Sequence, residues 1–129
     1  RDLYTQCDVW LASSRSEGFN LTAMEAMACR TPVVSTRTGW PLEAITCQVN
    51  GVLADIDDAA GLTAGAEYLL SLDDAQWRAA SQAAYQTVEA SSWENSARLF
   101  EAALDKAVAR RKSAQRPARP QPVALAGRG

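Results

Sequence analysis

Two short, mostly apolar runs stand out in the first third of the chain, at Cys7–Ala12 and Pro32–Ser35. Each run ends in polar residues, as is typical of buried parallel strands. Between them, residues 21–29 are apolar on nearly every face of a helix, which predicts that this helix is buried. We expect Thr31-Pro32 to end it, because a proline disfavours helical backbone at the preceding residue.

Turn and cap residues divide the rest of the chain. Asn50-Gly51 predicts a turn between Val49 and Val52. The spacing of apolar residues then predicts three helices, over about residues 58–72, 74–90 and 92–111. Candidate N-caps precede them: Asp57 or Asp58, Asp73, and Ser91 or Ser92. Two apolar stripes are expected to face the core: Leu62, Ala66, Leu69 and Leu70; and Trp93, Ala97, Phe100, Ala103, Leu104 and Ala107.

Strands that alternate with helices predict an α/β fold with a parallel sheet. At 129 residues and 47% hydrophobic content, the chain has the size and composition of one domain with a core. An open parallel sheet needs several strand–helix units to cover both of its faces. Because only two strand candidates are clear, we expect more of the sheet to lie upstream of Arg1.

The formal net charge of −2 hides an uneven distribution. Seven basic residues and no acid follow Asp105, whereas residues 1–105 contain six basic and fifteen acidic residues. Residues 112–129 are rich in Pro, Ala and Arg and lack periodicity, which predicts a disordered basic tail. A solvated extension and weak electrostatic contact with an anionic membrane both fit this tail. We expect no nucleic-acid partner.

Cysteine and histidine usage excludes several classes of site. The three cysteines form no C-x-x-C, so neither a disulfide framework nor a zinc site is expected. The chain contains no His, which removes histidine-based triads and the commonest metal ligand. No apolar run approaches the roughly 20 residues of a membrane span, and no signal peptide is visible. These features favour a cytoplasmic setting, with the tail allowing peripheral contact at the inner membrane surface.

The junction between the first strand and the first helix carries the candidate chemistry. Gly18 permits a tight turn there. The backbone N–H groups at the start of a helix have no partner within it, so they form a ready anion site. We therefore expect a phosphate at the helix start formed by Asn20, Leu21 and Thr22.

Two glutamates flank that helix start. Glu25 is the only charge in residues 21–29, so on a buried helix it needs hydrogen-bond donors or a wet cleft. It lies about one helical turn beyond the expected phosphate, roughly 5–6 Å along the axis, where a nucleotide's ribose would sit. Glu17 precedes the turn and would reach a transferred sugar on the other side of the phosphate. Carboxylates accept well from sugar hydroxyls, so both acids are interpreted as hydroxyl ligands.

The segment Ser14–Val34 resembles the E-x7-E region of retaining glycosyltransferases with the GT-B fold, the glycogen-synthase-like and sucrose-synthase-like group. The resemblance covers about residues 4–108 and is most specific at residues 14–34. It extends to Tyr4, residues 7–11, 39–45, 49–53 and Ser92-Trp93-Glu94.

The resemblance implies a fold and a set of roles. Residues 1–111 would be the distal part of a Rossmann-like C-terminal donor-binding domain, with residues 112–129 as the tail and the N-terminal acceptor domain missing. Glu17 would contact the donor sugar as the catalytic glutamate, and Glu25 would hold the ribose. The backbone facing sugar and diphosphate would be that of Gly18, Phe19, Asn20, Leu21 and Thr22.

The implied function is transfer of a sugar from a nucleotide-diphosphate sugar to an acceptor hydroxyl with retention of configuration. The acceptor class stays open between a glycan, a lipid-linked glycan and a small molecule. The family works without a bound metal or other cofactor. The isolated chain is not expected to turn over, because the acceptor half of the cleft and the family's cleft Arg and Lys are not in it.

The chain departs from the family pattern at four positions: Asn20 replaces Gly or Pro, Arg30 and Trp40 replace Gly, and Leu42 replaces Pro. We expect positions 30, 40 and 42 to alter packing or loop shape, and position 20 to bear on donor-sugar specificity.

Rival interpretations remain open at the level of sequence. The chain could be a non-catalytic or vestigial half-domain that acts as a binding or assembly module. Glu25 would then be a solvated charge and Glu17 an ordinary loop acid. Phosphorolysis of a glycan is a second enzymatic rival. Arg37 could neutralise a phosphate or be an exposed loop arginine.

Overall fold

The computed structural model describes residues 2–89 and 91–114. The chain divides after Ser91 into two compact units, which are described separately. The first unit is an α/β layer structure, and the second contains the helix α5 (Trp93–Ala114). The α/β class expected from the alternation of strands and helices is confirmed for the first unit.

The sheet has three parallel strands in the order β1-β2-β3, formed by β1 (Trp10–Ala12), β2 (Val33–Thr36) and β3 (Gly51–Ala54). The two clear strand candidates correspond to β1 and β2, and β3 is a strand within the chain that the sequence did not identify. The predicted turn lies at residues 48–50, but Gly51 already belongs to β3. A side chain at position 51 would collide with the backbone oxygen of Val33, so glycine lets the two strands approach.

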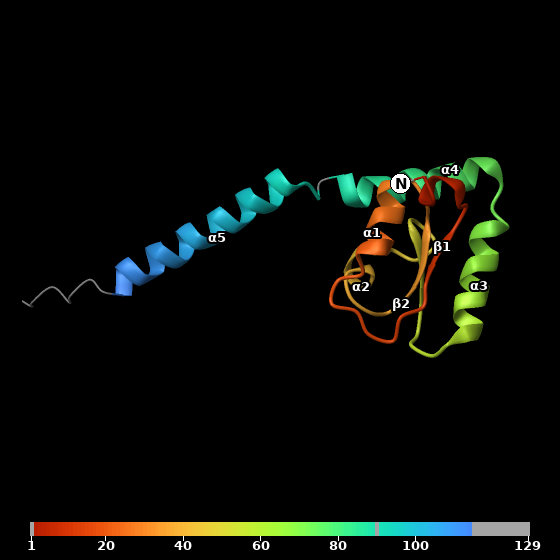
Figure 1. Ribbon diagram of the computed structural model, residues 1–129, viewed down its shortest axis with the longest axis horizontal. Helices are drawn as coiled ribbons and strands as arrows, with labels where there is room; N and C mark the ends of the chain where they lie inside the picture. The colour runs from red at the N-terminus through yellow and green to blue at the C-terminus, as the bar shows by residue number, and fades with distance from the viewer. Residues whose placement is uncertain (1, 90, 115–129) are drawn as a thin grey trace, which may run out of the picture. The chain divides into compact units, whose positions relative to one another are not determined.

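Helices cover both faces of this sheet (Figure 1). On one face, Val33 joins a buried cluster with Met27 of α1 (Leu21–Ala28) and Ala84 of α4 (Asp74–Glu89). On the other face, α3 (Ala59–Leu70) lies against β2 and β3. An added Cβ on Gly65 of α3 would lie 3.0 Å from a methyl group of Val34, which shows how closely this helix approaches the sheet. Alternate side chains of β2 thus enter two separate packed layers.

The three predicted C-terminal helices are present, and local side chains cap them as expected. Asp58 accepts a hydrogen bond from the Gly61 amide at 2.8 Å, and the Ser92 hydroxyl accepts one from the Asn95 amide at 3.1 Å. Asp73 and Gln76 cap α4 reciprocally, at 2.8 and 3.1 Å. Two further short helices are η1 (Tyr4–Gln6) and α2 (Pro41–Ala44).

The last helix continues three residues beyond Arg111, to Ala114. Lys112 and Ala114 are good helix formers, and the first proline comes only at position 117. Residues 115–129 of the predicted disordered tail lie outside the described residues. No helix within residues 2–89 and 91–114 is both long enough and apolar enough to cross a bilayer.

The prediction that α1 is buried on nearly every face was wrong. Ala23, Ala26 and Met27 are fully buried, but Leu21 is 62% exposed and Glu25 is exposed as well. Alanine, threonine and leucine at solvent-facing positions made the helix look uniformly apolar, although they are common on protein surfaces. The first predicted core stripe is only partly buried, since Leu69 is buried whereas Leu70 is exposed. The second stripe, on α5, was wrong: all six of its residues, from Trp93 to Ala107, are exposed.

Candidate functional site

The site lies at the carboxyl edge of the sheet, where ligands bind in open α/β folds. The chain leaves β1 at Ala12 and enters a loop of residues 13–20, and it leaves β2 at Thr36 and enters a loop of residues 37–40. The buried Thr36 hydroxyl donates to the Ser14 backbone oxygen at 2.5 Å. The two loops are thereby fixed to each other at their bases.

Glu17 is half-buried in the first of these loops. The Ser14 hydroxyl donates to its Oε1 at 2.6 Å. No described residue donates to Oε2, so that oxygen can accept from a ligand. An ionised carboxylate only accepts hydrogen bonds, so the natural ligand groups for Glu17 are hydroxyls.

The second loop supports the turn that follows Glu17. The Trp40 amide donates to the Phe19 oxygen at 2.8 Å, and the two aromatic rings stack with centroids 5.8 Å apart and planes 18° apart. Gly39 has φ +59°, and an added Cβ there would lie 2.7 Å from the same Phe19 oxygen. Trp40 itself has helical backbone with φ −58°. It therefore needs no glycine conformation, and its ring packs against the predicted donor turn.

Asn20 forms the N-cap of α1 in a left-handed conformation, with φ 76° and ψ 64°. Its Oδ1 accepts from the Ala23 amide at 3.3 Å and from the Thr22 hydroxyl at 3.0 Å. The resemblance places Gly or Pro here, and asparagine is among the residues that tolerate this conformation best. The Leu21 and Thr22 amides find no acceptor among the described residues. The helix start consequently offers two free donors to an anion.

Glu25 projects from the exposed face of α1, one turn beyond those amides. Its Oε2 accepts a hydrogen bond of 2.8 Å from the hydroxyl of Tyr4 in η1. This hydrogen bond, more than burial or charge repulsion from the same carboxylate, raises the pKa of Tyr4 above its ordinary value. Ala28 and Cys29 line a hollow beside this pair. Glu25 has found a donor, as predicted, but at the surface.

Two exposed ion pairs tie the loops of this edge to the loop between β3 and α3. Arg15 pairs with Asp57 at 2.6 Å, and Arg37 pairs with Asp55 at 3.0 Å. Exposed pairs of this kind contribute little to stability, so a phosphate could compete for either arginine. Within the described residues, no group of three or more His, Cys, Asp or Glu side chains could hold a metal ion.

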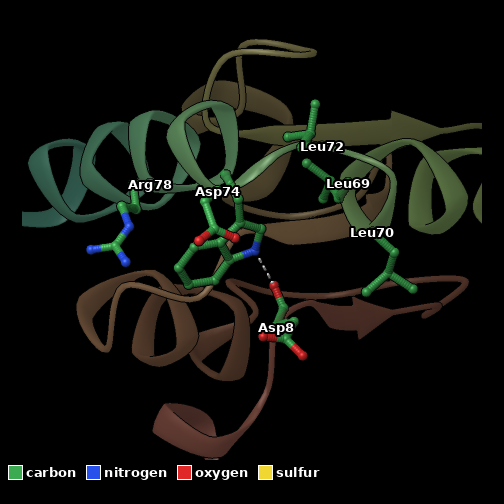
Figure 2. Close-up of a pocket in the computed structure, with 7 residues that line it drawn as sticks. Asp8, Leu69, Leu70, Leu72, Asp74 and Arg78 are labelled. Atoms are coloured by element: carbon green, nitrogen blue, oxygen red, sulfur yellow. Dashed lines mark hydrogen bonds between the residues drawn. The ribbon is translucent and has the colours of Figure 1, made fainter.

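A second hollow lies at the opposite edge of the sheet (Figure 2). Asp8 comes just before β1, and its backbone oxygen accepts a hydrogen bond of 3.0 Å from the indole of Trp77. Leu69, Leu72 and Arg78 contribute to its walls. None of the candidate site residues lies there. The predicted site residues belong instead to the loop of residues 13–20 and to α1.

Two neighbours of the site had no role assigned from sequence: Tyr4 and Thr36. Trp40 was expected only to alter packing or loop shape, and its ring stacks on Phe19. Tyr4 lies 21 residues before Glu25 and gave no local signal.

Comparison with known proteins gives matches in both sequence and structure. The family model "Glycosyl transferases group 1" matches residues 1–87. The D-inositol 3-phosphate glycosyltransferase of Corynebacterium urealyticum is 38% identical over 96 residues, which cover 74% of this chain and 22% of the relative.

Among solved structures, the sucrose-phosphate synthase of Thermosynechococcus elongatus superimposes with a TM-score of 0.72 at 29% identity, covering 83% of this chain and 27% of that one. Anabaena HepE in complex with UDP-glucose matches with a TM-score of 0.61 at 25% identity, covering 67% and 24%. The chain thus spans about a quarter of the length of these proteins.

Proposed function

Because this chain belongs to the group 1 glycosyl transferases, we propose that it is the donor-binding part of a retaining glycosyltransferase. Its parallel α/β fold is that of the family's GT-B structures, as the resemblance implied. The complete enzyme would transfer a sugar from a nucleotide-diphosphate sugar to an acceptor hydroxyl. The observation that carries this proposal is the start of α1, where two unpartnered amides lie between Glu17 and Glu25.

Each part of such a donor has a chemically matched place. The diphosphate binds the Leu21 and Thr22 amides, since a helix N-terminus favours negative charge. Glu25 lies roughly 6 Å further along the helix axis and accepts from the ribose hydroxyls. Glu17 lies before the turn, and its unpartnered Oε2 accepts from hydroxyls of the transferred sugar. The backbone from Gly18 to Asn20 then faces the junction of sugar and diphosphate.

The chemistry of the step follows from these contacts. As the bond between sugar and diphosphate breaks, negative charge grows on the leaving diphosphate. Amides fixed by α1 stabilise that charge without reorganising, and Glu17 and Glu25 hold the sugar and the ribose in place. We propose that no bound metal or cofactor takes part, and that further cationic groups come from outside this chain. Alone, the chain would bind the donor without completing the transfer.

The choice of donor base and acceptor lies beyond these residues. HepE binds UDP-glucose, so uridine nucleotides are the first probes to use. The names of the relatives point to different acceptors, inositol phosphate in one and a sucrose phosphate precursor in another. The acceptor would be a glycan, a lipid-linked glycan or a small molecule, and it would be held by an N-terminal acceptor domain.

Titration calorimetry with UDP-glucose tests this proposal. Glu25→Gln should weaken binding by about tenfold or more, because hydrogen bonds to a charged group contribute about 1.5–3 kcal/mol. Its melting temperature should stay close to that of the unmodified chain, because Glu25 is exposed. The control Glu67→Gln changes an exposed glutamate on α3 and should bind normally. Equal affinity in the Glu25 variant and the unmodified chain would favour a non-catalytic assembly module.

A further inference from the structure

Tyr4 and Glu25 come from separate elements and meet side chain to side chain. Tyr4 belongs to η1, before the first strand, and Glu25 lies in the middle of α1. The phenol hydroxyl donates to Glu25 Oε2 at 2.8 Å. Within the part of the chain that the structure describes, Tyr4 is the only side chain that donates to this carboxylate. Glu25 is otherwise an exposed glutamate with freely rotating side-chain bonds.

Contacts on several sides fix the position of Tyr4 itself. Its ring meets the ring of Trp10 in β1 edge to face, with centroids 4.8 Å apart. Its backbone oxygen accepts from the Thr31 hydroxyl at 2.7 Å and from the Cys7 amide at 3.1 Å. Thr31 lies just after the C-terminal end of α1, so the segment next to the helix that carries Glu25 also holds Tyr4. The phenol is therefore a fixed donor.

A fixed hydrogen-bond donor on one carboxylate oxygen of Glu25 also restricts the orientation of the other oxygen. With Oε2 held by Tyr4, Oε1 and the remaining lone pairs of Oε2 keep a defined direction and stay free to accept hydroxyls. A ligand then binds a carboxylate that is already ordered, so less conformational entropy is lost on binding. A tyrosine hydroxyl is already protonated at neutral pH, and the raised pKa of Tyr4 keeps this one a donor further into the alkaline range.

We propose that Tyr4 is a positioning residue for the donor nucleotide, which orients Glu25 toward the ribose hydroxyls without touching the ligand. This inference rests on the proposed function, because it needs Glu25 to hold the ribose. It adds a residue from η1, outside the E-x7-E segment, to the donor site.

Two variants and two probes separate this role from a structural one. Tyr4→Phe keeps the ring on Trp10 and removes the hydroxyl. Its affinity for UDP should fall about threefold to tenfold, the range expected for one lost hydrogen bond. The same substitution should have no effect on UDP binding in a Glu25→Ala background, because alanine leaves no side-chain acceptor for the Tyr4 hydroxyl. It should also have no effect on 2′,3′-dideoxy-UDP, which lacks the hydroxyls that Glu25 would accept.

The matched control is Tyr68→Phe, since Tyr68 lies on α3 and its hydroxyl makes no hydrogen bond within the described residues. That variant should bind UDP as the unmodified chain does. Unchanged or tighter UDP binding by Tyr4→Phe, with binding lost in Glu25→Gln, would overturn the role of Tyr4 and leave the donor site standing. An equal loss in both backgrounds would make Tyr4 merely structural. Normal binding by Glu25→Gln, or no UDP binding by the unmodified chain, would instead contradict the proposed function.

Discussion

Arg30 lies at a position where the backbone favours glycine. The backbone geometry therefore predicts which of two substitutions there, alanine or glycine, gives the more stable protein. It follows the C-cap of α1 with φ +67°. The Thr31 amide donates to the Ala26 oxygen at 3.0 Å and the Arg30 amide donates to the Met27 oxygen at 3.0 Å. This pair of bonds is a Schellman motif, whose left-handed residue is usually glycine. This left-handed backbone explains why the family usually has glycine at this position.

The arginine side chain partly offsets its backbone strain. Its guanidinium lies 4.3 Å from the centre of the Tyr85 ring and donates to the Gln82 side chain. Such a cation–π contact contributes about 0.5–1 kcal/mol at an exposed site. Arg30→Ala loses these contacts and keeps the strain. Arg30→Gly loses the same contacts but removes about 1–2 kcal/mol of left-handed backbone strain. Against this, glycine costs about 0.5–1 kcal/mol because it loses more conformational entropy on folding.

The glycine variant should therefore be about 0.5–1 kcal/mol more stable than the alanine variant, or about 3–6 °C higher in melting temperature. Thermal and urea unfolding followed by circular dichroism measure this difference. Arg78 provides the control, because it lies inside α4 and has ordinary helical backbone. There the order should reverse, with glycine about 1 kcal/mol less stable than alanine. An alanine variant at position 30 as stable as the glycine variant would refute the reasoning.

Three further predictions concern neighbouring positions. Asn20→Ala should lower the free energy of unfolding by about 1–2 kcal/mol, because it loses the helix cap and keeps left-handed backbone, whereas Asn20→Gly should lose only a few tenths; equal urea midpoints for the two would count against it. Gly39→Ala should lower the free energy of unfolding by about 1–2 kcal/mol, because a Cβ there meets the Phe19 oxygen; a melting curve that matches the unmodified chain would contradict this. The raised pKa of Tyr4 means that the folded state holds this proton more tightly than the unfolded state. The resulting stability is present below the ordinary tyrosine pKa and is lost as the pH rises through the folded-state pKa. Between about pH 8 and pH 11, the unmodified chain should therefore lose more stability than Glu25→Gln. Parallel losses in urea titrations at the two pH values would refute the coupling.

Features that depend on local sequence were predictable. The caps at Asp58, Asp73 and Ser92 follow from side chains that accept from the amide three residues further on, and the helices that they start were placed within a few residues. The turn after β1 was placed correctly, but the role given to Gly18 was wrong: its φ is not positive and an added Cβ there would contact nothing, and the left-handed residue of the turn is Asn20.

Features that depend on distant contacts were not predictable. Strand β3 is four residues long and begins with Gly51. A side chain there would collide with the backbone oxygen of Val33, which lies 18 residues earlier in the chain. The exposed face of α1 was missed because only Thr22 and Glu25 mark it as polar, whereas Leu21 and Ala28 on the same face look like core residues. The Tyr4–Glu25 contact joins elements 21 residues apart, and only the fold brings them together.

Mapping amide chemical shifts during titration with UDP-glucose tests the central claim most directly, because it locates the donor on the chain. We predict that the largest shifts fall on the amides from Glu17 to Glu25, with Leu21 and Thr22 foremost, and that Tyr4 shifts with them. Shifts confined to the hollow around Asp8 and Trp77, or an absence of shifts at the start of α1, would contradict the assignment of this turn and helix as the donor site.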